Sequence, residues 1–292
     1  MNKMIEIVQP GGVIERDEAI RSGAARLSGR LFLPRETPQA AVVLNGATGV
    51  PHGYYGDFAR WLATERGLAC LTYDYSDFGA SARGHIRTSK ATMGHWGIHD
   101  QQAARDHLAH LLPDTPLWVI GHSLGALCLP MQQGLDRIDR IIAVASGPVH
   151  LTDHPWSYRP FAAAFWHGPT ALATLALGYL PGRRFGLGAD LPAGVYWQWR
   201  RWCTQRGFYA REAGSTLPWP DRQKPACALR AVAVADDPMI PPHTVWKLMQ
   251  LYPETTRSQK VLRPAEYGLP KIGHIGAFHR RAQACWPDIL GD

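Results

Sequence analysis

The chain has 292 residues, of which 46% are hydrophobic and 19% are charged. A chain of this size and composition can bury a large core, which excludes a disordered protein, a collagen-like protein and a small disulfide-bonded scaffold. The 31 lysines and arginines outnumber the 24 aspartates and glutamates, and the formal net charge is +7. No nucleic-acid reader motif accompanies this positive charge, so we expect no nucleic-acid partner.

The five cysteines are odd in number and widely spaced, which argues against a disulfide framework or a zinc knuckle. The N-terminal residues contain no apolar core followed by a small-residue cleavage site, so we expect a cytoplasmic protein. The uncharged residues 160–182 approach the length of a membrane span. Because this stretch is rich in alanine and is interrupted by His167-Gly168-Pro169, we predict two short helices and no integral membrane span.

Short apolar runs alternate with helix-like runs along most of the chain. We predict strands at residues 40–45, 68–73, 116–120, 138–144, 228–234 and 259–262. We predict helices around residues 58–62, 104–112 and 242–251. This alternation is typical of an α/β fold with a mostly parallel sheet and helices on both faces. The first forty residues resemble antiparallel strands at one edge of the sheet.

The alternation stops between residues 147 and 221, where six of the eleven tryptophans lie. We predict one sheet domain formed by residues 1–147 and 221–292, with residues 148–220 inserted as a helical cap. The cap tryptophans would close over an apolar pocket. Seven arginines also belong to this segment, namely Arg159, Arg183, Arg184, Arg200, Arg201, Arg206 and Arg211. A cationic rim of this kind would favour an anionic ligand.

The sequence Gly-His-Ser-Leu-Gly at residues 121–125 directly follows a predicted strand and matches the motif G-x-S-x-G. The small residues on either side of the serine allow a tight strand-to-helix turn that exposes the hydroxyl of Ser123. The helix predicted after this turn would point its amides and the positive end of its dipole toward the same place. Pro130 is expected to kink or end that helix, and we interpret His122 as a packing residue.

A serine hydroxyl needs a base to become a nucleophile, and the base needs an orienting carboxylate. His274 follows the last predicted strand, whereas Asp236 and Asp237 follow the strand at residues 228–234. These positions place both kinds of side chain at the edge of the sheet that carries Ser123. The order Ser, Asp, His along the chain is the order found in α/β-hydrolases.

From about Gly29 to its C-terminus the chain resembles the α/β-hydrolase superfamily. In more detail it is similar to a bacterial branch of predicted hydrolases related to monoacylglycerol-lipase and serine-aminopeptidase-like groups. The closer resemblance is carried by residues 45–51, 71–75, 121–125, 188–194, 236–238 and 272–276. It implies an α/β-hydrolase fold with Ser123 as nucleophile, His274 as general base and then acid, and Asp237 as the carboxylate that orients the imidazole.

Three carboxylates are candidates for the orienting role. Asp237 is preferred because the family pattern D-x-x-x-P places the acid four residues before a proline, which here is Pro241. Asp236 is the second candidate. Asp153 is the third, because some hydrolases take this acid from the loop after an earlier strand.

The family's oxyanion hole takes one backbone amide from the residue after the nucleophile and another from the loop after an early strand. The resemblance therefore implies Leu124 and Ala47 as the oxyanion donors, with Thr48 as the neighbour of Ala47. Many relatives have His-Gly in this loop, where this chain has Asn45-Gly46. The identity of the second inward-pointing amide therefore stays open.

The expected activity is that of a serine hydrolase of the carboxylesterase or lipase type. Its substrate would be a small acyl compound, apolar or anionic, whose ester, thioester or small amide is cleaved through an acyl-enzyme. This chemistry requires no cofactor and no metal. Two alternatives stay open: an acyltransferase that uses the same triad, and a non-catalytic ligand binder with a hydrolase fold. The oligomeric state is open as well, with a homo-oligomer as one option.

Overall fold

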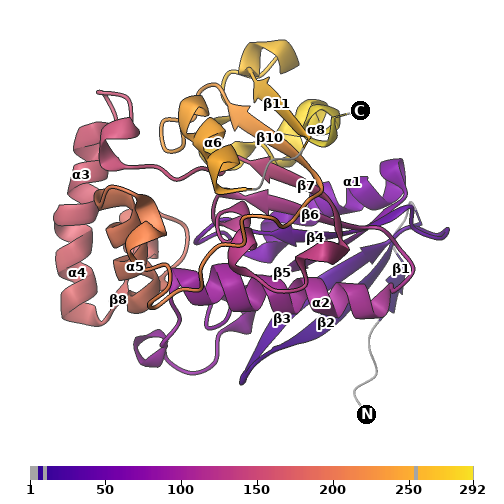
Figure 1. Ribbon diagram of the computed structural model, residues 1–292, viewed down its shortest axis with the longest axis horizontal. Helices are drawn as coiled ribbons and strands as arrows, with labels where there is room; N and C mark the ends of the chain where they lie inside the picture. Colours follow the sequence, from indigo (N-terminus) through magenta and orange to yellow (C-terminus); the bar gives the residue numbers. More distant parts are fainter. Residues whose placement is uncertain (1–5, 9–11, 253–255, 292) are drawn as a thin grey trace.

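The computed structural model describes residues 6–8, 12–252 and 256–291. Within these residues nine strands form one sheet, in the order β1-β2-β3-β5-β4-β6-β7-β10-β11 (Figure 1). The antiparallel edge consists of β1 (Glu6–Val8), β2 (Ile14–Ser22) and β3 (Ala25–Leu33). From β5 onward the neighbouring strands run parallel, so the prediction of a mostly parallel sheet is confirmed.

Each strand predicted from an apolar run is present. The parallel strands are β4 (Ala40–Asn45), β5 (Leu68–Tyr73), β6 (Leu117–His122), β7 (Ile138–Val144), β10 (Ala228–Val234) and β11 (Arg257–Leu262). Every residue of β4 and β5 is buried, as expected for central strands covered on both faces. The carboxyl ends of the parallel strands meet at one edge, which is where the residues with candidate chemistry lie.

Helices cover both faces of the sheet and give the domain two hydrophobic cores. The covering helices are α1 (Gly56–Arg66), α2 (Gln101–Leu111), α6 (Pro242–Leu248) and α8 (Trp286–Leu290). Ala41 and Val43 of β4 belong to the core that includes α2 and α6. Val42 and Leu44 belong to the core that includes α1 and α8. This alternation follows from the two-residue period of a strand.

The segment of residues 148–220 lies beside the sheet, at the left of Figure 1. It contains the helices α3 (Arg159–His167), α4 (Pro169–Leu177) and α5 (Ala193–Thr204), with the short strands β8 (Tyr179–Leu180) and β9 (Leu191–Pro192). The prediction of two short helices in residues 160–182 is confirmed, because Gly168 separates the end of α3 at His167 from the start of α4 at Pro169. In the described ranges no helix is both long and apolar enough to cross a membrane.

The helix predicted after the G-x-S-x-G motif is short. It is a 3-10 helix, η5 (Ser123–Ala126), followed by a second short 3-10 helix, η6 (Leu129–Met131). Pro130 accounts for its short length, because proline has no N–H to donate to the carbonyl four residues earlier, which is that of Ala126. The hydroxyl of Tyr252 donates to this carbonyl instead, at 2.6 Å. The helix beside the serine is therefore a single short 3-10 turn, in keeping with the expectation that Pro130 kinks or ends it.

A chain of buried hydrogen bonds joins three loops at the carboxyl edge of the sheet. The amide of Ala47 donates to the hydroxyl of Tyr55 at 2.8 Å, and this hydroxyl lies 2.8 Å from Nδ1 of His122. Nε2 of His122 lies 2.9 Å from the carbonyl oxygen of His274. A carbonyl only accepts, so Nε2 of His122 carries the proton and Nδ1 accepts from Tyr55. His122 is therefore neutral, and each of its two ring nitrogens has a hydrogen-bond partner.

The pKa values of His122 and Tyr55 agree with these roles as hydrogen-bond acceptor and donor. Burial, followed by the proximity of His274, lowers the pKa of His122 from 6.5 to about 3. Burial raises the pKa of Tyr55 well above its usual value, so its hydroxyl keeps the proton that it donates. His122 was interpreted as a packing residue, and the structure adds that it links two loops through hydrogen bonds.

A buried neutral His122 predicts a fold that loses stability in acid. The unfolded histidine takes up a proton below about pH 6.5, whereas the folded one does so only near pH 3. Between these values this residue should lower the free energy of unfolding by roughly 1.4 kcal/mol for each pH unit of acidification. Urea unfolding of the wild type and of His122→Gln across this range measures the effect, since glutamine does not titrate. Equal pH slopes for the two proteins would contradict a neutral His122.

Candidate active site

Ser123 lies at the tip of a tight turn at the end of β6. Its backbone φ is +54°, in the left-handed region that side chains usually avoid. A Cβ at Gly125 would lie 2.2 Å from the carbonyl oxygen of Asn45, and one at Gly121 would lie 2.4 Å from the carbonyl carbon of Gly125. The turn thus packs directly on the end of β4 and has no room for a side chain at either glycine. This packing holds Ser123 in its strained conformation.

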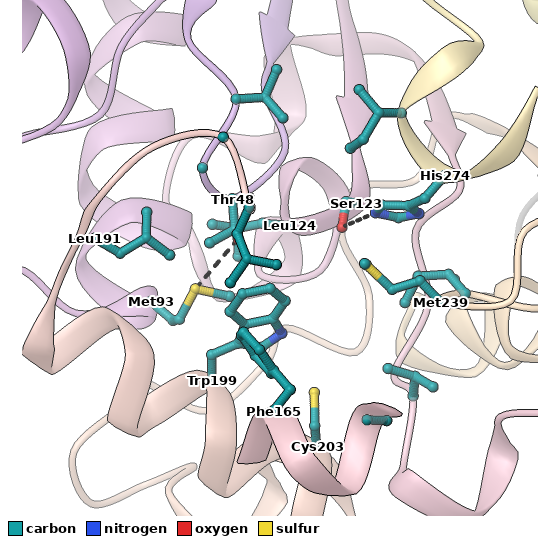
Figure 2. Close-up of a pocket in the computed structure, with 18 of the residues that line it drawn as sticks. Thr48, Met93, Ser123, Leu124, Phe165, Leu191, Trp199, Cys203, Met239 and His274 are labelled. Carbon is teal, nitrogen blue, oxygen red and sulfur yellow. Dashed lines mark hydrogen bonds between the residues drawn. The ribbon is translucent and has the colours of Figure 1, made fainter. Parts of the chain in front are cut away.

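The structure brings Ser123, His274 and Asp237 into hydrogen-bond contact. Oγ of Ser123 lies 3.1 Å from Nε2 of His274, the contact drawn in Figure 2. Nδ1 of His274 lies 2.7 Å from Oδ2 of Asp237, whose Oδ1 accepts from the amides of Met239 and Ile240 at 2.8 and 3.0 Å. The buried carboxylate is thus fixed on both sides. It favours a proton on Nδ1 of His274, which leaves Nε2 free to accept one from the serine.

The two other candidate carboxylates have different partners. Asp236 accepts hydrogen bonds from two backbone amides of the segment just before His274, at 3.1 and 2.9 Å. Asp153 lies 2.7 Å from Nζ of Lys247. Of the three carboxylates considered from the sequence, Asp237 is the one that contacts His274. Asp236 instead fixes the backbone that carries the histidine.

The two expected oxyanion donors differ in their surroundings. The amide of Leu124 lies in the first turn of η5, where N–H groups have no acceptor within the helix. The amide of Ala47 already donates to the hydroxyl of Tyr55, and Ala47 does not line the cavity at Ser123. The Ala47 amide is therefore already engaged in this structure. Thr48 does line the cavity, and its amide has no acceptor among the described residues.

A cavity of about 500 Å³ opens at Ser123 and His274. Residues of the 148–220 segment form much of its wall, including Phe165, Trp199 and Cys203, which lie across the cavity from the serine in Figure 2. No Asp, Glu, Lys or Arg side chain lines it, so the arginines of this segment lie outside its wall. Two of the segment's six tryptophans, Trp166 and Trp199, line the cavity.

Sequence reasoning missed the contacts of Tyr55 and of Asp236. Each side chain bonds to a segment that is distant along the chain, and such contacts leave no local pattern in the sequence. In the part of the chain that the structure describes, no group of three His, Cys, Asp or Glu side chains is placed to hold a metal ion.

Solved structures similar to this chain share its fold at low sequence identity. A hypothetical protein of Pseudomonas aeruginosa has a TM-score of 0.63 and 14% identity, covering 100% of this chain and 97% of that one. An alpha-beta serine hydrolase homologue from Coxiella burnetii has a TM-score of 0.54 and 13% identity, covering 94% and 95%. A thermophilic esterase from Thermogutta terrifontis has a TM-score of 0.53 and 14% identity, covering 90% and 93%.

The chain also matches a family model over most of its length, whereas the solved structures show only a shared fold. No curated protein matches the chain significantly. The sequence model of the alpha/beta hydrolase family matches residues 41–285, which include nearly all of the parallel strands, the inserted helices and the three residues in contact, but not the antiparallel edge β1–β3. The chain therefore belongs to the alpha/beta hydrolase family.

Proposed function

We propose that this protein is a serine hydrolase that cleaves a carboxylic ester with an apolar acyl group through an acyl-enzyme. The observation that carries this proposal is the hydrogen-bonded set Ser123, His274 and Asp237, of which Ser123 and His274 line an apolar cavity. A nucleophile, a base and an orienting carboxylate in this arrangement are the parts that acyl transfer to a serine needs.

The first half of the proposed reaction forms the acyl-enzyme. Nε2 of His274 takes the proton of Ser123 while Oγ attacks the ester carbonyl, and Asp237 stabilises the imidazolium that results. The amides of Leu124 and Thr48 donate to the oxyanion of the tetrahedral intermediate. The imidazolium then gives its proton to the departing alcohol, and the acyl group stays on Ser123.

The second half of the reaction releases the acid. His274 removes a proton from water, which attacks the acyl carbonyl, and the same two amides stabilise the second tetrahedral intermediate. The imidazolium returns its proton to Oγ of Ser123 as the carbon–oxygen bond breaks. The products are a carboxylic acid and the free enzyme.

The cavity favours an apolar acyl group over an anionic one. Its volume lies within the range of roughly 300 to 1,000 Å³ that is typical of small-molecule sites. A carboxylate inside it would lose its hydration without meeting a lysine or arginine, which costs several kcal/mol or more. An alkyl chain meets aromatic and aliphatic side chains there and is stabilised by burial.

We also infer a cap role and a cytoplasmic location. Residues 148–220 act as the cap of a core formed by residues 1–147 and 221–292, because the segment contributes wall residues to the cavity. Cys70, Cys128, Cys203 and Cys285 are buried thiols that form no disulfide. Thiols of this kind are usual in a reducing compartment.

A series of p-nitrophenyl esters from acetate to palmitate tests the chemistry and the size of the pocket together. We expect kcat/KM of the wild type to rise by roughly threefold to fourfold per methylene until the cavity is full. Ser123→Ala should lower turnover by several orders of magnitude for every ester. Unchanged turnover in the variant would exclude Ser123 as the nucleophile. Binding of the esters without turnover in the wild type would favour the ligand-binding alternative.

Three asparagine variants test the role of each carboxylate. Asp237→Asn should lower turnover by roughly three to four orders of magnitude, because the amide cannot stabilise an imidazolium on His274. Asp153→Asn is the matched control, because it removes a charge that does not contact His274 or the backbone before it, and we expect at most about a tenfold loss from it. Asp236→Asn keeps a side-chain oxygen that can accept from the backbone before His274, so we expect at most about a tenfold loss here as well. Ester hydrolysis at pH 7 and a thermal unfolding curve for each variant separate catalysis from stability. A larger loss in either of these two variants than in Asp237→Asn would contradict the assignment.

A further inference from the structure

Large hydrophobic side chains that are exposed to solvent gather in one stretch of the chain. The described residues contain six of them, of which five lie between positions 156 and 185. These five are Trp156, Phe161, Leu172, Leu175 and Phe185. We call them, with the arginines of the same stretch, the 156–185 surface. Such a concentration of apolar side chains usually marks a binding surface.

Helix α4 presents its apolar side chains to solvent and its hydroxyl groups to the protein. Leu172 and Leu175 are 67% and 74% exposed, whereas Thr170 and Thr174 are buried. The hydroxyl of Thr174 donates to the carbonyl of Thr170 at 2.7 Å, and that of Thr170 donates to the carbonyl of Phe165. A surface helix normally has the opposite arrangement. In Figure 1, α4 and its neighbour α3 form the outer edge of the molecule.

The charge of this stretch has one sign. From position 154 to position 189 the sequence contains no Asp and no Glu but has three arginines. Arg183 and Arg184 are exposed, and the neighbouring carboxylate of Asp190 accepts from the backbone amide of Arg183 at 3.1 Å and, within the described residues, forms no ion pair with either guanidinium. The guanidinium of Arg159 lies 4.2 Å from the ring centroid of Trp156, which is 81% exposed. Apolar side chains thus lie among unpaired positive charges.

The mouth of the cavity opens in the same stretch. Four residues that line the cavity are also exposed to solvent, and three of them belong to residues 156–188. These three are Phe161, Gly186 and Gly188. A partner that binds the 156–185 surface would therefore lie against the entrance of the cavity that leads to Ser123.

We propose that the 156–185 surface docks on a phospholipid bilayer that carries anionic headgroups. Leucine and aromatic side chains bury in the boundary between headgroups and acyl chains, while arginines contact lipid phosphates. A second copy of this chain fits less well, because two surfaces with only positive charges repel each other. The uptake of an ester from the bilayer through the cavity mouth rests on the proposed function. The docking on the bilayer does not rest on it.

Vesicle flotation tests the docking with the full chain. We expect binding to vesicles of phosphatidylcholine with one third phosphatidylglycerol, weaker binding to phosphatidylcholine alone, and loss of binding at high salt. Leu172→Ser with Leu175→Ser should weaken the partition coefficient by about tenfold or more, and so should Arg183→Gln with Arg184→Gln. Circular dichroism and thermal unfolding check that the variants fold.

Two control variants make this test specific. Trp219→Ser removes the exposed hydrophobic side chain that lies outside the 156–185 surface, and it should leave vesicle binding unchanged. Ser123→Ala should bind vesicles like the wild type, so a failure of the proposed chemistry is seen separately from a failure of docking. Absence of vesicle binding, equal binding to both vesicles, or wild-type binding by the double leucine variant would overturn the proposal. The proposal would also be overturned if the wild type dimerised without binding vesicles and the double leucine variant stayed monomeric.

Discussion

The contact between the turn after β6 and the end of β4 sets the position of the candidate active site. Gly125 lies so close to the carbonyl of Asn45 that a single added carbon would overlap it. The side-chain amide of Asn45 donates to the carbonyl of Gly125 at 3.1 Å, and the hydroxyl of Tyr73 donates to Asn45 Oδ1 at 2.7 Å. Three neighbouring strands are thereby joined at one point. The left-handed conformation of Ser123 persists because this packing leaves the turn no alternative.

Buried hydrogen bonds then position the parts that surround Ser123. Asp237 fixes the ring of His274, while Asp236 and His122 fix its backbone, so the histidine is oriented from both ends. The same chain continues through Tyr55 to Ala47 and takes up an amide that family resemblance assigns to the oxyanion. Fully satisfied networks of this kind make the interior rigid, and they are costly to disrupt in part.

The sequence predicted the framework of the site better than its finer contacts. Strands such as residues 138–144 and 228–234 were predictable, because buried parallel strands read as continuous apolar runs. Asp237 was favoured by its distance from Pro241 along the chain, and Pro130 marked the end of a helix. The Tyr55 contact to Ala47 was not predictable, because it depends on how a loop folds over the sheet edge. This contact engages the amide that the family resemblance assigns to the oxyanion.

The proposed chemistry depends on Ser123 being a nucleophile that His274 activates. Intact-protein mass spectrometry after treatment with a fluorophosphonate probe tests it most directly, because the probe reacts with an activated serine and loses fluoride. We expect one adduct per chain, located on the peptide that contains Ser123, and no adduct on Ser123→Ala. An adduct that persists in Ser123→Ala, or a wild type that stays unlabelled while correctly folded, would contradict it.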